Sequence, residues 1–461
     1  MRRGAIPQRE HHQHSEDDVS LTRDEARDII RRTLEMAKAD ETEVSIEANR
    51  EANLRYANNE VSTSGDVSNV VITVGAYYGK RRGAASINQY DDESLRRVVQ
   101  RAQETARFAP EDPESMPLLG EQKYADRSHY DEATASAAPE SRASVARHAI
   151  QLAKKTNLVA AGFMTNSGTV SALGNSRGLF AYDRLSRATF SNTVRTKEGN
   201  GSGWAGTNAD RLDQMNAAAL VDTAAEKAVM SKNPRSLDPG TYTVILEPAA
   251  VADLLLYFAF QFDARSADEG RSFFSKKGGG TKVGEKVLSD KVTIWTDPGD
   301  TRAPGPVFAG GGLPTSRVSW IENGVLRNLV YSRFWADKMK AEPVPSPVNI
   351  IMKGGTGSIA DLVKSTKNGV LVTRLWYIRF LDPQSVLLTG LTRDGVFKIE
   401  NGKIRHALRN FRFNDTPVSV FSKLDAMSRE VRTRGSESED FSIVCPAVRT
   451  QFTFSSASEA V

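Results

Sequence analysis

Two segments in the second half of the chain, residues 318–327 and 396–405, each place an Asn-Gly pair between short runs in which apolar and polar residues alternate. Such alternation is typical of a half-buried β-strand. The Asn-Gly pairs suit a type I′ turn, because both central residues of that turn need a positive φ. The two segments therefore predict tight antiparallel hairpins and exclude an all-helical fold for this half of the chain. Glycine-rich loops and further alternating runs extend this β-rich pattern at 308–312, 353–357, 441–445 and 451–454.

The N-terminal part of the chain combines helical and strand patterns. Thr22 and Glu25 form a capping-box pattern, and the apolar residues that follow recur with the helical period. A second helix is predicted over 91–109, because Pro110 prevents its continuation. Between these helices we expect strands at 43–47, 54–57 and 70–74 and a strand–turn–strand at 77–85. The mixture predicts an α+β domain with an antiparallel sheet.

The middle of the chain alternates helices with turn-rich segments. Helices are predicted over 141–156 and over an alanine-rich stretch at 212–231. Between them we expect short β-segments separated by turns at 166–168 and 174–178, followed by a flexible glycine-rich loop at 199–206. The segment 233–240, with two prolines and a glycine, predicts a domain linker. After the linker we expect a buried strand at 242–246, a helix from Pro248 to about Ala264 and a strand at 292–295.

The predicted fold class is α+β, with three domains along the chain. Residues 1–20 are expected to form a disordered tail. The domains are a helix and antiparallel-sheet domain over 21–120, a middle α/β region over 140–235 and a β-rich C-terminal domain over 241–455.

Composition excludes several classes of protein. The chain carries 61 basic and 57 acidic residues, a net charge of +4 that is too small to indicate a nucleic-acid groove. The longest apolar run, at 254–260, is far shorter than the ~20 residues that span a bilayer. The single cysteine, Cys445, excludes an internal disulfide and a multi-cysteine metal site. We therefore expect a cytoplasmic protein that binds neither membrane nor nucleic acid.

Histidine is scarce, and its placement is informative. Three of the six histidines lie in the polar N-terminal tail, and the others, His129, His148 and His406, are isolated from one another in sequence. No two of these three share the i, i+4 spacing that places both rings on one face of a helix. The residues alone therefore predict no zinc site built by this chain.

Several motifs occur together, in an order and spacing that resemble one protein family. The most specific is the segment 390–397, Gly-Leu-Thr-Arg-Asp-Gly-Val-Phe, which runs into the second Asn-Gly hairpin. Supporting segments lie at 79–86, 246–248, 374–379 and 410–413. From residue 22 to 454 the chain resembles the TldD/PmbA (TldD/TldE) peptidase family. The resemblance implies an α+β N-terminal domain, a middle region and a β-rich C-terminal domain.

Within that family, the TldD branch is a zinc-dependent peptidase with an H-E-x-x-x-H helix after the strand–Pro entry. Counted from Pro248, the two histidines would fall at Leu256 and Gln261, neither of which is a zinc-ligand type, and Tyr257 stands where the general-base glutamate would be. Cys445 lies near the position of a C-terminal cysteine ligand in the family. We interpret it as a buried structural cysteine, with an incomplete metal site as the alternative.

The resemblance therefore implies the metal-free PmbA/TldE-like branch. It implies no catalytic, cofactor-binding or metal-binding residue in this chain, and zinc in a TldD-like partner subunit. The expected function is proteolysis of short or unfolded peptides by the resulting heterodimer.

Two alternatives come from the residues themselves. The first is a self-sufficient hydrolase without metal, using acid/base groups in or after the key helix if they are buried. Its candidate residues are Asp253, Asp263, Ser266, Asp268 and Glu269. The second is a non-enzymatic peptide-binding scaffold or DNA-associated regulator, suggested by the basic runs at 80–82 and 96–97. No aromatic stacking platform accompanies those runs, as single-strand nucleic-acid binding would require.

Overall fold

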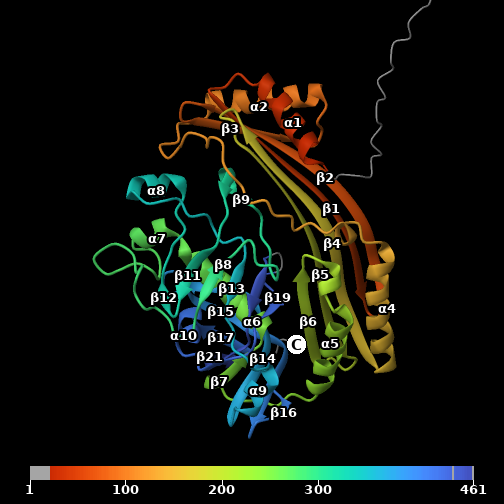
Figure 1. The fold of residues 1–461 in the computed structure, drawn as a ribbon. Helices are drawn as coiled ribbons and strands as arrows, with labels where there is room; N and C mark the ends of the chain where they lie inside the picture. Colours follow the sequence, from red (N-terminus) through yellow and green to blue (C-terminus); the bar gives the residue numbers. More distant parts are fainter. Residues whose placement is uncertain (1–20, 439–440, 459–461) are drawn as a thin grey trace, which may run out of the picture.

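The computed structural model describes residues 21–438 and 441–458. The predicted tail, 1–20, lies outside the described residues. Figure 1 shows a long curved sheet that arches over a more compact C-terminal half. The architecture is mixed α+β, as predicted.

The arch is a six-stranded antiparallel sheet with the strand order β3-β2-β1-β4-β5-β6. Its strands are β1 (Glu41–Ala57), β2 (Glu60–Tyr78), β3 (Arg81–Ile87), β4 (Leu158–Asn175), β5 (Phe180–Thr196) and β6 (Ser202–Ala209). β1 and β4 pair continuously from Glu43↔Asn175 to Tyr56↔Gly162. The sheet therefore joins strands from the 21–120 segment to strands from the 140–235 segment.

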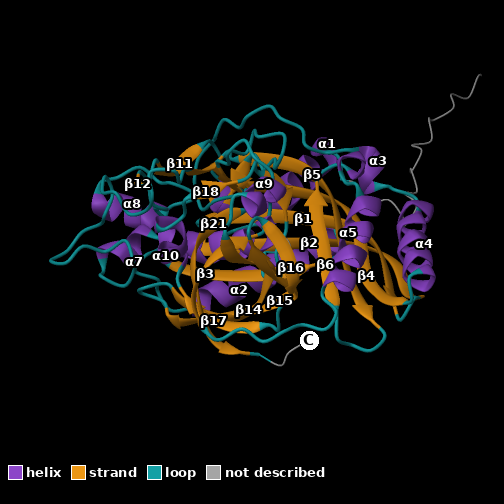
Figure 2. Cartoon of the chain, turned by 90° about the horizontal axis from the view of Figure 1, so that it is seen from below, coloured by secondary structure: helices purple, strands orange, loops and turns teal. Residues whose placement is uncertain are grey.

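Helices cover one face of this sheet. They are α1 (Arg23–Met36), α2 (Asp92–Phe108), α4 (Pro139–Lys155) and α5 (Ala217–Met230). Apolar residues at alternate positions of β1, among them Val44 and Ile46, are buried against α1 and α2. In Figure 2, α4 and α5 lie next to each other beside the strands. The capping box at Thr22 and Glu25 is formed, and it fixes the start of α1.

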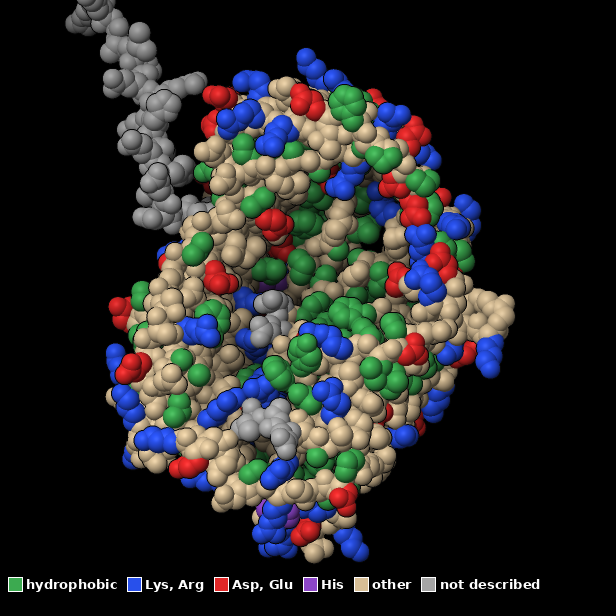
Figure 3. All heavy atoms as spheres, turned by 180° about the vertical axis from the view of Figure 1, so that it is seen from behind, with side chains coloured by type: hydrophobic (Ala, Val, Ile, Leu, Met, Phe, Trp, Pro, Cys, Tyr) green, Lys and Arg blue, Asp and Glu red, His purple; other side chains and the backbone are tan. Residues whose placement is uncertain are grey.

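The opposite face of the sheet is polar. Ser171 donates to Glu47 at 2.7 Å, and Thr169 donates to Asn49 at 3.0 Å, so polar side chains pair across β1 and β4. Figure 3 shows a deep hollow between the arch and the C-terminal half, in which apolar side chains gather beside a few acidic ones. The period of two along each strand produces this division, since successive side chains point to opposite faces.

Two predictions about the middle segment were wrong. The expected turn at 166–168 lies inside the long strand β4, and most of the expected loop at 199–206 belongs to β6. Asn166 is buried, and its side chain donates to the carbonyls of Thr134 and Ala135 instead of to a local turn. A Cβ on Gly168 would lie 2.8 Å from the Cβ of Ala135, so this glycine serves close packing.

The C-terminal half contains two larger sheets. One has the order β12-β11-β8-β13-β20-β19, and the other has the order β14-β7-β21-β17-β15-β16 with β18 paired to β21. Because β14 also pairs with β15, the pairings of β14, β7, β21, β17 and β15 close on themselves. The strands are β7 (Gly240–Leu246), β8 (Ile294–Thr296), β11 (Val318–Glu322), β12 (Val325–Leu326), β13 (Ile350–Met352), β14 (Asn368–Asp382), β15 (Leu387–Glu400), β16 (Lys403–Ala407), β17 (Phe411–Asp415), β18 (Ala426–Met427), β19 (Val431–Thr433), β20 (Ile443–Cys445) and β21 (Val448–Ala457).

Both predicted Asn-Gly hairpins are confirmed. They connect β11 to β12 and β15 to β16. The φ angles are 48° and 79° at Asn323 and Gly324, and 48° and 74° at Asn401 and Gly402, as a type I′ turn requires. The remaining elements are short: α3 (Glu132–Ala135), α7 (Ala264–Asp268), β9 (Phe308–Ala309), β10 (Leu313–Pro314), α8 (Arg333–Met339), α9 (Ile359–Lys364) and α10 (Pro417–Ser422).

The helix α6 (Pro248–Ala259) occupies the centre of the C-terminal half. It begins at the predicted proline but ends earlier than expected, in a short 3₁₀ turn over Phe260–Phe262. Phe258 is fully buried and contacts the rings of Phe262, Phe274 and Phe421. Among the described residues, no helix is both long enough and apolar enough to cross a membrane.

Candidate functional site

The three positions that the family resemblance assigns to metal chemistry lie on or just after α6. Tyr257 is buried, and its hydroxyl donates to the carbonyl oxygen of Ile378 at 2.7 Å. The side-chain oxygen of Gln261 accepts from the hydroxyl of Ser272 at 3.2 Å and from the backbone N–H of Phe273 at 3.3 Å. Leu256 is half-buried and lines a small cavity. The polar groups at these positions are thus used in internal hydrogen bonds.

The partner of Tyr257 belongs to a β-bulge in β14. The pairing with β15 shifts between Trp376 and Arg379, and Tyr377 has a φ of 55°, which is unusual for a bulky residue. The displaced Ile378 donates its N–H to a carboxylate oxygen of Glu437 at 3.0 Å. The bulge therefore turns a backbone N–H and C=O away from the sheet and toward the side chains around α6.

Asp253, the acidic residue of α6, is fully buried. Its carboxylate accepts the backbone N–H groups of Ser436 and Glu437, both at 2.9 Å, and the hydroxyl of Ser438 at 3.1 Å. A Cβ on Gly435 would lie 2.0 Å from a carboxylate oxygen of Asp253, so only glycine fits there. Burial disfavours the charged form and raises the pKa of Asp253 to about 7, although the donors oppose this shift. Asp253 therefore anchors the 435–438 loop to α6.

Cys445 is fully buried on β20 and contacts the other end of α6. Its sulfur lies 3.4 Å from the carbonyl oxygen of Pro248, eight residues before Leu256. Eight helical residues correspond to about 12 Å along the axis. Cys445 therefore does not converge with Leu256 or Gln261, and the geometry supports the interpretation as a structural cysteine.

We expect Cys445 to be unreactive in the folded protein. Burial raises the pKa of its thiol well above the ordinary value, and the nearby Asp253 carboxylate acts in the same direction. A disulfide reagent at pH 8 should leave the native chain unlabelled and should titrate one thiol after denaturation in guanidinium. The Cys445→Ala variant, which has no thiol, gives the background level of labelling. Equal labelling rates in the native and unfolded states would contradict the buried position.

The side chains around α6 that the structure describes do not fit a zinc ion. Among the described residues, no group of three His, Cys, Asp or Glu side chains is arranged to hold a metal. His148 binds Asp222 at 3.1 Å between α4 and α5, whereas His129 forms a bridge to β5 and His406 lies on β16. No catalytic step through a metal follows from this chain's own side chains.

The acid/base candidates of the hydrolase alternative are not brought together. Asp263 caps α7 by accepting the N–H of Ser266 at 2.7 Å. Asp268 accepts from the indole of Trp335 at 2.8 Å, and Glu269 is exposed and forms ion pairs with neighbouring arginines. Each of the three carboxylates thus has a local structural partner, and the fourth, Asp253, is sealed from solvent.

The basic runs at 80–82 and 96–97 also make local contacts. Arg81 lies 3.7 Å from Glu111, and Arg82 lies over the ring of Tyr77. Arg97 donates to the hydroxyl of Ser94 at 3.0 Å. These contacts are those of solvated helix and hairpin faces.

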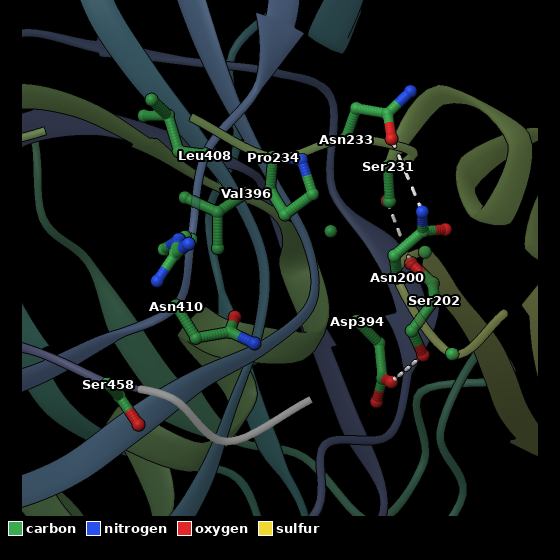
Figure 4. A pocket seen from close by; sticks show the side chains of 14 residues that line it. Asn200, Ser202, Ser231, Asn233, Pro234, Asp394, Val396, Leu408, Asn410 and Ser458 are labelled. Carbon is green, nitrogen blue, oxygen red and sulfur yellow. Dashed lines mark hydrogen bonds between the residues drawn. The ribbon is translucent and has the colours of Figure 1, made fainter. Parts of the chain in front are cut away.

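The 390–397 motif joins the two halves of the molecule. Asp394 is fully buried, accepts from Nε of Arg374 at 2.8 Å and also binds the hydroxyl of Ser202, at the start of β6. In Figure 4, Asp394 and Ser202 point toward each other beside a cavity of about 430 Å³. The motif stands out in the sequence, but its role in joining the two halves does not. Asp394 follows Arg393 in a strand that also carries other polar residues, so the residues next to it gave no signal of its burial.

Comparisons with known proteins agree with the fold. Three family models match consecutive parts of the chain: PmbA/TldA metallopeptidase domain 1 at 42–106, the central domain at 121–232 and the C-terminal domain at 239–456. The metalloprotease PmbA of Escherichia coli O157:H7 is 24% identical over 443 residues, covering 91% of this chain and 94% of that protein. A metalloprotease of Methanocaldococcus jannaschii is 24% identical over 236 residues, covering 46% of this chain and 48% of that protein.

A solved structure described as TldE from Thermococcus kodakarensis superimposes with a TM-score of 0.83 at 19% identity, covering 93% of this chain and 99% of that one. The matched models span all three parts of the chain, in the order in which their motifs occur. The chain therefore belongs to the PmbA/TldD metallopeptidase family.

Proposed function

We propose that this chain is the zinc-free, TldE/PmbA-like subunit of a heterodimeric metallopeptidase that cleaves short or unfolded peptides. The observation that carries the proposal is that the two metal-ligand positions and the general-base position of the family are used here for internal packing. Leu256 lines an apolar cavity, while the polar atoms of Tyr257 and Gln261 are satisfied by buried partners. An ion placed there would break these internal hydrogen bonds without finding side chains to coordinate it, and leaving buried polar groups unpaired costs several kcal/mol.

In this proposal the chain contributes substrate-binding surface, and zinc belongs to a TldD-like partner. The polar inner face of the arch, with Ser171 and Thr169 among its side chains, suits the backbone of an extended peptide regardless of its sequence. The outer strand β3, which is mostly exposed, offers an additional mode, in which a peptide adds to a sheet edge. The compartment is expected to be the cytoplasm, with neither membrane nor nucleic acid as a partner.

The name TldE carried by the Thermococcus kodakarensis relative is consistent with this assignment. The Escherichia coli relative is named a metalloprotease, so membership of the family alone does not separate the two branches. The side chains of α6 are the basis for choosing the zinc-free branch.

Metal analysis tests the proposal. The chain purified alone is expected to contain far less than one zinc per molecule and to show no peptidase activity. Expressed together with a zinc-bearing family member, it should co-purify, and peptide cleavage should appear and be lost with a chelator.

Cys445→Ala is a suitable control, because a structural thiol contributes no metal binding and the zinc content should not change. Stoichiometric zinc and cleavage by the chain alone would refute the proposal. Cleavage that survives the chelator and is lost in Asp263→Ala would favour the metal-free hydrolase instead.

A further inference from the structure

A cavity of about 310 Å³ lies against the C-terminal end of α6, which we call the α6 hollow. Its apolar walls are formed by Leu256, Ala259, Phe260, Val330, Ile350 and Phe441. The carbonyl oxygen of Phe441 accepts a hydrogen bond from Asn208 of β6 at 3.2 Å. The α6 hollow therefore borders the inner side of the arch, the side on which a peptide would lie.

The α6 hollow has an acidic group at its edge. Asp263 is exposed and lines the hollow together with the hydroxyl-bearing Ser346. One carboxylate oxygen of Asp263 caps α7 through the N–H of Ser266. Asp263 is an exposed residue, and within the part of the chain that the structure describes it forms no ion pair. An apolar hollow with one carboxylate at its edge matches a ligand with an apolar group next to a cation.

We propose that the α6 hollow binds the N-terminal residue of a peptide, with its apolar side chain inside and its α-ammonium group at Asp263. The volume lies at the lower end of the ~300–1,000 Å³ range of ligand sites, which suits one residue rather than a longer segment. Phe260, which is 58% exposed, stands at the edge and would be covered by the bound residue. The inference rests on the proposed function only for the class of ligand, a peptide.

Calorimetric titration of the full chain, without any partner, tests this inference. The probes are leucylglycylglycine, its N-acetylated form and triglycine. Replacing the leucyl side chain by hydrogen should weaken binding about 10-fold or more, since burying a Leu side chain is worth ~1.5–3 kcal/mol. Acetylation removes the ammonium charge and should weaken binding about fivefold, as the loss of an ion pair at an exposed carboxylate predicts.

Asp263→Asn isolates the charge, because Asn caps helices as well as Asp does and the start of α7 is kept. The Asp263→Asn variant should bind leucylglycylglycine as weakly as it binds the acetylated form. The affinity for the acetylated form should be the same in the variant and in the parent chain. Asp268→Asn is the matched control on the same helix, since its side-chain oxygen still accepts from Trp335. It should bind like the parent chain.

Several outcomes would overturn the inference: equal binding of free and acetylated peptides, parental affinity in Asp263→Asn, or no binding of the leucyl peptide up to about 10 mM. Because no partner or zinc is present, such a result would leave the heterodimer proposal intact. Conversely, stoichiometric zinc in the isolated chain would refute the proposed function without changing the meaning of the binding data.

Discussion

Replacing Asp394 with alanine is expected to lower the free energy of unfolding by about 3–5 kcal/mol, because it leaves the charge of a buried arginine unpaired. The side chain of Asp394 is 0% exposed and that of its partner Arg374 is 12% exposed. The substitution also removes the hydrogen bond from Ser202 that connects the arch to the C-terminal half. Urea denaturation followed by tryptophan fluorescence measures the effect.

Asp425→Ala is the matched control, since Asp425 also pairs with an arginine, Arg449, but is 59% exposed. Exposed ion pairs contribute about 0–1 kcal/mol, so this variant should unfold close to the parent chain. If both alanine variants changed stability by the same small amount, Asp394 would not hold the two halves together.

Asp253 is expected to make stability decrease with rising pH. Its pKa rises from the ordinary 3.8 to about 7 in the folded chain, because burial disfavours the carboxylate. Between these two pH values, the folded state keeps a proton that the unfolded state has released. Each pH unit therefore costs the folded state up to about 1.4 kcal/mol, and the whole interval about 4 kcal/mol. Above about pH 7 this contribution stops changing.

The measurement compares the unfolding free energies of the parent chain and Asp253→Asn from pH 4 to pH 8. Asn has nearly the same shape as Asp but does not titrate, so the difference between the two curves isolates the carboxyl group. The parent chain should lose stability relative to the variant as the pH rises, and the difference should level off near pH 7. A constant difference, or one that grows in favour of the parent chain, would show that Asp253 stays ionised when buried.

The two carboxylates have related structural roles. Asp253 fixes the 435–438 loop, whose Glu437 accepts from Ile378 in the bulge that also receives the Tyr257 hydroxyl. Asp394 binds Ser202 of β6 and Arg374, and Arg374 also donates to Ser436, whose N–H binds Asp253. Polar networks of this kind specify one arrangement when every member is satisfied. They therefore hold the arch at a fixed distance from α6.

Local signals in the sequence identified most of the individual elements correctly. The Asn-Gly hairpins, the capping box at Thr22, the helix starting at Pro248 and the helix ended by Pro110 all follow from residues adjacent in sequence. Turn chemistry and capping act over two to four residues, so they can be recognised in the sequence before the fold is known. The replacement of the family's metal-site residues by Leu256, Tyr257 and Gln261 was also recognisable in the sequence, because these positions follow from the spacing to Pro248.

The predictions that were wrong concern residues whose partners are distant in sequence. Asn166 and Gly168 read as a turn, yet the structure uses them for contacts with the segment around Thr134 and Ala135. The buried states of Asp253 and Asp394 could not be predicted from neighbouring residues, because Asp253 binds Ser436 and Asp394 binds Ser202, each more than 180 residues away in the chain.

The sequence by itself determined the type of most helices and strands, the hairpin turns and the replacement of the family's metal-site residues at positions 256, 257 and 261. The tertiary structure alone decided that strands of two predicted domains share one sheet, that Asp394 joins the halves and that Asp263 lies at the edge of an apolar hollow. The physical reason is the distance along the chain over which each kind of interaction acts. Backbone preferences and turn chemistry act between neighbours in the chain, whereas burial and charge pairing depend on which distant segments the fold brings into contact.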